Sequence, residues 1–183
     1  MIYKFSTMKI KLNNLYKTKI IFKNKIFFCQ IGKKGIIPSF KKKEGDKFTP
    51  RGKWKINNIY YRKDKIKFFR RKQSLKNMYT VIRSNYIWSD NIYDYKYNKL
   101  ISEKSKDKLE KSSEKLFRDD DVYDLVLEIN YNMSPIIKGK GSAIFFHYSF
   151  PDNRPTNGCI AMNKNDLNFI INNLQKKNYI YIE

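Results

Sequence analysis

The sequence predicts a mainly β protein with some α structure, built as a single domain. β-Branched and aromatic residues gather in short runs, which favours strands over helices. One segment near the C-terminus instead spaces its apolar residues as one face of a helix. The 183 residues suit one hydrophobic core, and an apolar fraction of 41% with 13 Phe and 14 Tyr can fill it. We therefore expect one domain over residues 1–183.

The N-terminal third supplies the first predicted strands. Residues 18–31 are β-branched and aromatic with interspersed lysines, and they predict two short strands joined at residues 23–25. The charged loop 41–53 follows. Within it, Pro50 and Gly52 predict a turn over residues 49–52. A further strand is expected around residues 54–56.

The C-terminal third predicts two core strands, a helix and a closing strand. Residues 123–132 alternate in polarity and residues 141–149 are almost wholly apolar, which favours core strands. Asn163 with Asp166 resembles a capping box and predicts the start of a helix. A last strand is expected over residues 179–183. The apolar face of the helix consists of Leu167, Ile170, Ile171 and Leu174.

Residues 62–121 form the least regular part of the sequence. They combine basic clusters with a long charged stretch, yet they also contain Trp88, Tyr93 and Tyr97. Long irregular segments are usually functional or disordered, so we expect a loop-rich, lid-like insertion beside a substrate groove. The alternative is a solvated charged surface.

The charge balance is strongly basic, with 39 Lys and Arg against 17 Asp and Glu and a formal net charge of +22. Nucleic-acid binding requires clustered cations, whereas these lysines are spread from Lys4 to Lys177. The accompanying Asn, Ile, Tyr and Phe all have A/T-rich codons, so genome composition can supply much of the charge. We expect no specific nucleic-acid partner, although a basic nucleic-acid-binding protein remains an alternative. A positive field also steers anionic substrates such as carboxylate-bearing peptides.

The two cysteines, Cys29 and Cys159, and the single histidine, His147, cannot complete a zinc site of Cys and His ligands. The sequence therefore predicts no metal and no cofactor. A disulfide between the two cysteines is an alternative, but it would consume a thiol that chemistry could use.

No targeting or membrane-spanning segment is predicted. Residues 1–22 contain five lysines and lack the run of about 7–15 apolar residues typical of a secretory signal. No run of about 18 or more apolar residues occurs that would predict a transmembrane helix.

His147 and Cys159 are the candidates for chemistry. A thiol attacks acyl groups as the thiolate, and histidine is the base best matched to that task near neutral pH. The strand that ends in His147 leads through a Pro- and Gly-punctuated loop to Cys159, at the expected start of a helical segment. Gly158 permits close backbone approach or a positive φ. Alternatively, a lone histidine at a strand end is a surface or capping residue.

Three motifs occur in the order known from one enzyme family. Thr156, Asn157, Gly158 and Cys159 resemble the [Ser/Thr]-x-Gly-Cys signature of the YkuD-type L,D-transpeptidases. Residues 45–52 resemble the Lys-x-Thr-Pro-x-Gly segment of the same family, and residues 141–147 resemble its histidine strand. The resemblance spans about residues 20–183 and is closest to a compact bacterial branch. Further segments of that branch are matched by Trp88-Ser89-Asp90, Tyr97-Asn98 and Tyr131-Asn132.

The resemblance implies a β-rich catalytic domain in which Cys159 accepts an acyl group from the L-centre of a peptidoglycan tetrapeptide stem. Terminal D-alanine would leave, and the amine of a second stem would accept the acyl group. By the same likeness, the Gly158 carbonyl would orient His147, and backbone amides near Cys159 would bind the oxyanion. The expected substrate or oxyanion contacts are Thr156, Asn157, Tyr131, Arg154 and Trp88.

The sequence departs from the commoner family pattern in two ways. Ala161 stands where an arginine is usual, and the interval from His147 to Cys159 is shorter. Arg154 can replace that arginine as a carboxylate contact, or it is simply an exposed loop residue. Water could replace the amine as acceptor, which would make the protein an L,D-carboxypeptidase or amidase, and a catalytically dead wall-binding module is a further alternative. The resemblance implies a place in the cell envelope or periplasm, and we expect a monomer.

Overall fold

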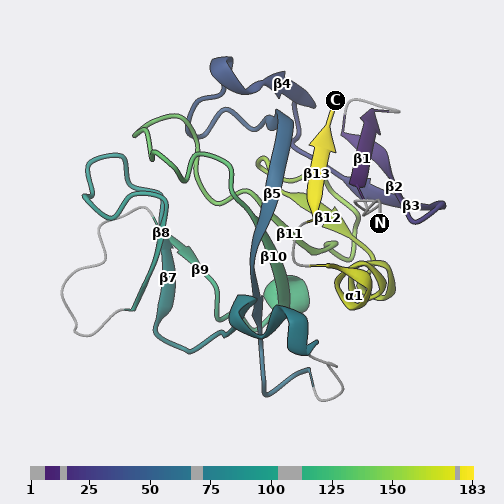
Figure 1. The fold of residues 1–183 in the computed structure, drawn as a ribbon. Coiled ribbons are helices and arrows are strands. Elements are labelled where there is room, and N and C mark those ends of the chain that lie inside the picture. The colour runs from purple at the N-terminus through teal and green to yellow at the C-terminus, as the bar shows by residue number, and fades with distance from the viewer. Residues whose placement is uncertain (1–6, 13–15, 67–71, 103–112, 176–177) are drawn as a thin grey trace.

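The computed structural model describes residues 7–12, 16–66, 72–102, 113–175 and 178–183 (Figure 1). Within these ranges the chain is mainly β, as predicted, and no helix is long and apolar enough to cross a membrane. The elements in order are β1 (Thr7–Leu12), β2 (Lys17–Phe22), β3 (Lys25–Gln30), β4 (Ile36–Pro38), η1 (Ser39–Lys41), β5 (Thr49–Tyr61), η2 (Gln73–Met78), β6 (Tyr79–Val81), β7 (Tyr86–Ser89), β8 (Lys99–Ser102), β9 (Ser113–Lys115), η3 (Asp121–Tyr123), β10 (Leu125–Ile129), β11 (Phe145–Tyr148), β12 (Ile160–Met162), α1 (Lys164–Asn173) and β13 (Tyr179–Ile182).

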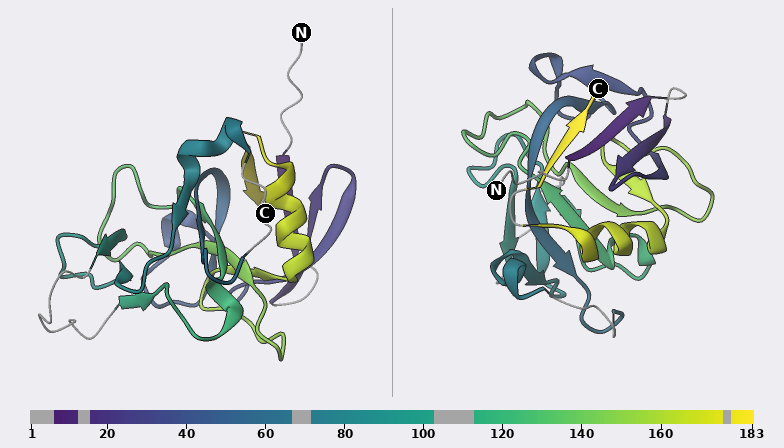
Figure 2. Two further views of the ribbon diagram at one scale, coloured as in Figure 1. Left: turned by 90° about the horizontal axis from the view of Figure 1, so that it is seen from below. Right: turned by 45° about the vertical axis from the view of Figure 1, so that its right-hand side comes forward.

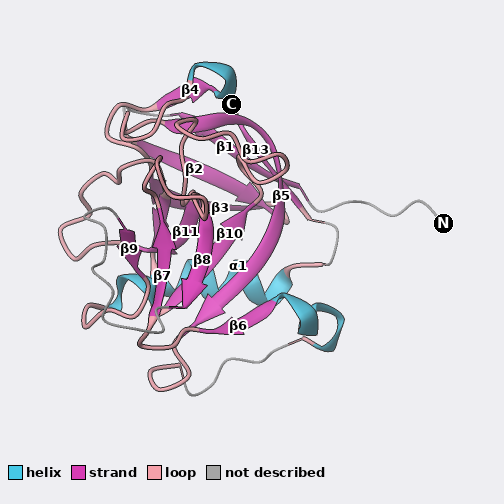
Figure 3. Cartoon of the chain, turned by 90° about the vertical axis from the view of Figure 1, so that its left-hand side faces the viewer, coloured by secondary structure: helices cyan, strands magenta, loops and turns pink. Residues whose placement is uncertain are grey.

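Eight of these strands close into a ring. The pairing order is β10-β11-β12-β3-β2-β1-β13-β5, and β5 also pairs with β10. The long strand β5 makes closure possible because residues 52–55 pair with β13 while residues 56–61 pair with β10. In Figures 1 and 3, β5 is a long, curved strand that runs through much of the height of the molecule. Within the ring, β11 and β12 lie side by side. His147 lies on β11, and Cys159 directly precedes β12.

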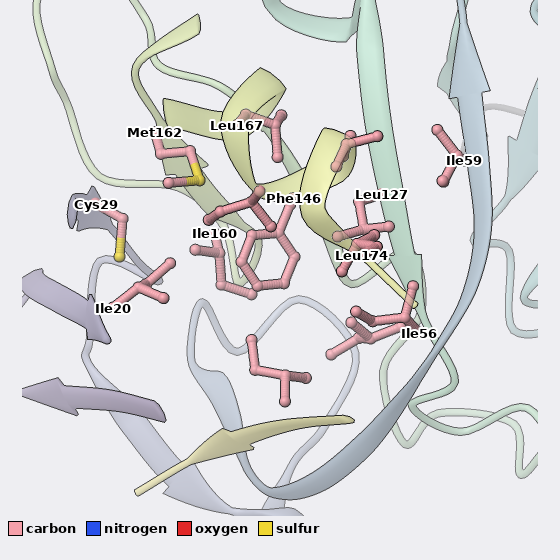
Figure 4. Packing of buried hydrophobic residues seen from close by; sticks show 14 of the residues in the cluster. Ile20, Cys29, Ile56, Ile59, Leu127, Phe146, Ile160, Met162, Leu167 and Leu174 are labelled. Carbon is pink, nitrogen blue, oxygen red and sulfur yellow. The ribbon is translucent and has the colours of Figure 1, made fainter. Parts of the chain in front are cut away.

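The core fills the ring, and α1 packs against it. Asn163 caps the helix as predicted, since its side chain accepts a hydrogen bond from the Asn165 N–H at 2.8 Å. Figure 4 shows Leu167 and Leu174 beside Phe146 of β11. Figure 2 shows α1 lying along the ring, away from the small sheet of β7, β8 and β9. A second buried cluster, around Trp88 and Phe145, joins that sheet to the ring.

The segment 62–121 is more regular than the sequence predicted. Its described part contains η2, a strand β6 that pairs with β5, and an antiparallel sheet in the order β8-β7-β9. Loops still connect these short elements, so the described part of the segment combines the expected irregular residues with regular structure. The predicted strand pair at residues 18–31 is confirmed as β2 and β3. Part of the charged stretch lies outside the described residues, and a lid function remains a prediction.

Two local predictions were wrong because strand pairing between distant residues overrode the local sequence preference. Residues 49–52 begin β5 instead of forming a turn, since Thr49 pairs with Ile36 of β4 and Gly52 pairs with Ile182 of β13. Proline is tolerated near the start of a strand. Similarly, Cys159 does not enter a helix directly but precedes the short strand β12, with α1 following.

Replacing Phe146 with alanine should destabilise the protein, because this side chain is fully buried inside the ring. We expect the free energy of unfolding to fall by roughly 3–5 kcal/mol, measured by urea titration. Phe28→Ala is the matched control, since the Phe28 side chain is 69% exposed on β3. That change should stay within about 0.5 kcal/mol. Equal losses in the two variants would contradict the described core.

Candidate active site

A cleft of about 490 Å³ contains both candidate residues. Cys159 and His147 line it together with residues from distant segments, namely the loop 42–47, strand β9, the 3-10 helix η3 and the loop 154–158. The structure therefore brings the predicted pair into one cavity of the size usual for a substrate pocket.

Cys159 is half-buried, and its thiol is a free cysteine, as is that of Cys29. The structure therefore contains no disulfide between Cys29 and Cys159. The Cys159 Sγ donates to the Ala143 carbonyl at 3.0 Å and accepts from the Phe145 N–H at 3.4 Å. Among the described residues these two backbone groups are its hydrogen-bond partners, and His147 is not one of them. Catalytic hydrogen bonds often form only when substrate binds.

Burial keeps both candidate groups neutral. It raises the pKa of the Cys159 thiol to about 12 and lowers the pKa of the His147 imidazole to about 4, because each charged form would lose its hydration. The Phe145 N–H and the Lys42 ammonium oppose the rise in the Cys159 pKa, while Glu114 adds to it. Near neutral pH the resting pair is therefore a thiol and an imidazole, and no ion pair is formed in advance.

The turn before Cys159 is held by hydroxyl groups. The Thr156 Oγ1 donates to the Cys159 carbonyl at 2.7 Å and accepts from the Gly158 N–H at 3.1 Å. Gly158 has φ 141°, and a Cβ there would lie 2.9 Å from the Phe48 carbonyl oxygen. The buried Thr49 hydroxyl donates to the Gly158 carbonyl at 2.8 Å and accepts from the Gly32 N–H at 2.9 Å. Glycine is therefore required sterically, and Thr156 positions the turn.

His147 is buried on β11 between two aromatic rings. The rings of Tyr123 and Phe150 lie at centroid distances of 5.2 Å and 5.9 Å from the imidazole. The His147 Nδ1 lies 2.8 Å from the Tyr148 carbonyl, which can only accept, so Nδ1 carries the proton and Nε2 is left as the basic nitrogen. The expectation that the Gly158 carbonyl orients the imidazole is corrected, because the carbonyl of Tyr148 has that role and the carbonyl of Gly158 is bonded to Thr49.

Asn98 holds the backbone of Ala143, whose carbonyl accepts the hydrogen bond from the Cys159 thiol. The Asn98 Oδ1 accepts from the Ala143 N–H at 3.1 Å and from the Trp88 Nε1–H at 3.0 Å. Ala143 has φ 50°, a left-handed conformation that an L-residue keeps only when its surroundings enforce it. Asn98 and Trp88 therefore position the carbonyl of Ala143 against Cys159.

Two of the expected contacts lie elsewhere. Trp88 is 2% exposed and packs edge-on against Phe145 at 4.9 Å, behind the cleft and not along it. The Tyr131 hydroxyl donates to the Lys140 carbonyl, and its ring packs against Trp54, so Tyr131 also lies outside the lining. Their ring sizes and hydrogen-bond partners explain these core positions. Asn157 and Arg154 do line the cleft.

Sequence reasoning missed several residues of the cleft wall. The sequence predicts that Tyr123 lies in a core strand and that Glu114 and Arg118 lie in a charged insertion. All three residues line the cleft. The Tyr123 hydroxyl donates to Glu114 at 2.9 Å, and Arg118 forms a bidentate pair with Asp120. A charged run gives no local signal for such a role, because the contacts depend on β9 folding back beside η3.

Comparison with known proteins identifies the family. Residues 12–182 match the model of the YkuD family, described as the L,D-transpeptidase catalytic domain. The match covers nearly the whole chain, so the protein belongs to this family. Searches of curated proteins and of solved structures found no match.

The lowered pKa of His147 predicts a loss of stability in acid. Since the folded pKa of about 4 lies below the ordinary 6.5, the neutral ring stabilises the fold above pH 6.5, and this contribution is lost as the pH falls through 4. The shift corresponds to on the order of 3 kcal/mol. We expect the difference in unfolding free energy between wild type and His147→Gln to shrink over this range, measured by urea titration at each pH. A constant difference would contradict the buried neutral ring.

Proposed function

We propose that the protein is a cysteine acyltransferase that acts on peptidoglycan stem peptides through an acyl-enzyme on Cys159. One observation carries the proposal: Cys159 shares a cleft with His147, whose Nδ1 is bonded to a carbonyl so that Nε2 can take a proton. Membership of the YkuD family supports the same reaction class. At the level of the family, the activity belongs in the cell envelope.

The proposed reaction begins with a neutral pair. Binding of the donor stem brings its peptide carbonyl to the Cys159 Sγ, and His147 Nε2 removes the thiol proton as the C–S bond forms. His147 then gives this proton to the leaving amine as the C–N bond breaks, which releases D-alanine. The amine of a second stem then attacks the thioester, a new C–N bond forms as the C–S bond breaks, and His147 transfers the proton of the amine to the Cys159 sulfur, which restores the thiol.

Backbone amides next to Cys159 are proposed to bind the oxyanion. Thr156 and Thr49 hold this turn from both sides, which keeps its amide groups fixed before the reaction starts. Preorganised donors of this kind are worth about 3–4 kcal/mol each in other acyl-transfer enzymes.

The charges of the cleft suit a substrate that carries carboxylates and an amine. Arg154 is proposed as a carboxylate contact, and its guanidinium lies 4.0 Å from the centroid of the Phe150 ring beside His147. Arg118 lies on the same cleft, fixed by Asp120. Acidic side chains of the lining, such as Glu114, suit an ammonium group.

Mass spectrometry of the intact protein tests the proposal. After exposure to a tetrapeptide stem or a carbapenem, we expect a covalent adduct on the wild type and on Cys29→Ala, and none on Cys159→Ala. Cys29 is the matched control because it is buried in the core, where burial raises its pKa. Activity lost with Cys29→Ala in a folded protein would contradict a single nucleophile.

The products of the same reaction separate the remaining alternatives. A cross-linked dimer of stems identifies a transpeptidase, whereas a free tripeptide identifies an L,D-carboxypeptidase with water as acceptor. No adduct on Cys159, together with salt-sensitive retention on DNA, would favour a nucleic-acid-binding protein instead.

His147→Gln should slow acylation of Cys159 by about 10²–10⁴-fold, the usual contribution of a general base. In the wild type, the acid limb of kcat/KM should lie near pH 4, since burial lowers the pKa of His147 to about 4. Stopped-flow acylation rates, measured from roughly pH 3.5 to roughly pH 8, report both effects. Unchanged acylation in the variant would show that another base acts.

A further inference from the structure

Three neighbouring segments that adjoin the cleft carry large exposed hydrophobic side chains. These side chains come from η1 and from the loops 90–98 and 131–143, and we call them the aromatic rim. Single exposed apolar residues need no explanation, but a group of this kind marks an interaction site. Its members and their exposed fractions are Phe40 at 72%, Ile92 at 38%, Tyr93 at 85%, Tyr95 at 79% and Ile137 at 53%.

Hydrogen bonds join the three segments of the aromatic rim. The Lys140 Nζ donates to the Phe40 carbonyl at 3.1 Å, and the Lys138 Nζ donates to the Tyr93 carbonyl at 3.4 Å. The Glu44 N–H, just after η1, donates to the Gly139 carbonyl at 2.8 Å. Figure 1 shows the segments beside one another at the upper left, on the opposite side of the molecule from β3.

The rim is continuous with the cleft. Glu44 belongs to the cleft lining and accepts a hydrogen bond from the Tyr97 hydroxyl of the loop 90–98. Asp90, at the start of that loop, and Ser142, at the end of the loop 131–143, also line the cleft. The segments that carry the rim therefore also supply residues of the cleft lining.

We propose that the aromatic rim binds the glycan strand that carries the stem peptide. The inference rests on the proposed function for the identity of the polymer. Aromatic faces stack on the C–H faces of pyranose rings, and tyrosine hydroxyls and lysine ammonium groups donate to sugar hydroxyls and carboxylates. Lys41 and Lys96 supply such cations, since they lie 5.8 Å and 5.2 Å from the rings of Phe40 and Tyr95.

The composition of the rim favours a glycan over a lipid surface or a nucleic acid. Its most exposed members are tyrosines, which have a polar edge, and a lipid surface selects deeper aliphatic and tryptophan contacts. A nucleic acid needs a track of cations along its phosphates. Here two of the lysines, Lys138 and Lys140, use their Nζ groups to join the segments of the rim.

Binding of peptide-free glycan strands tests the proposal. Strands stripped of their stems by an amidase serve as the probe, and affinity electrophoresis measures the dissociation constant. We expect the double variant Tyr93→Ala/Tyr95→Ala to bind at least tenfold more weakly than the wild type. Phe28→Ala is the matched control, because Phe28 is similarly exposed but lies on β3, away from the rim, and it should bind as the wild type does.

Two further measurements separate this proposal from the proposed function. The rate of Cys159 alkylation by iodoacetamide should be unchanged in the double variant, which shows that the cleft is intact. Cys159→Ala should still bind the glycan, so failure of the catalytic proposal leaves this test valid. Equal binding by the double variant, or equal weakening in Phe28→Ala, would overturn the proposal. So would a rim-dependent preference for anionic vesicles or a single-stranded oligonucleotide over the glycan.

Discussion

Strand β5 pairs with β13 along residues 52–55 and with β10 along residues 56–61, and this double pairing closes the ring of strands. Closure removes two sheet edges and gives the apolar side chains an enclosed interior. It also sets the place of β11, which pairs with β10, and of β12, which pairs with β11. His147 and the turn that carries Cys159 owe their positions to this chain of pairings.

The site combines two reactive groups in an environment that opposes the charge of each. Burial favours the thiol form of Cys159 and the neutral form of His147. The hydrogen bond from the Phe145 N–H and the charge of Lys42 act in the other direction and lower the pKa of the Cys159 thiol.

Residues that never touch the thiol hold the parts that do. Thr49 bonds the turn at Gly158, and Asn98 bonds the backbone of Ala143, whose carbonyl accepts the hydrogen bond from the thiol. The segment 62–121 thus contributes Trp88 and Asn98, which support the site, and Glu114 and Arg118, which line the cleft wall. Its outer loop, with Tyr93 and Tyr95, extends the same structure to the surface.

The sequence by itself determined the β-rich class, the strand pair at residues 18–31 and the helix capped by Asn163, because these depend on local periodicity and on capping chemistry. It also determined the choice of Cys159 and His147 as the candidate pair, because the chain has a single histidine. Only the tertiary structure decided that residues 49–52 extend as a strand, that the Tyr148 carbonyl selects the tautomer of His147, and that Trp88 and Tyr131 lie behind the cleft. Each of these depends on contacts between residues far apart in the chain or on burial, whose free energy arises from strand pairing and packing and leaves no local pattern.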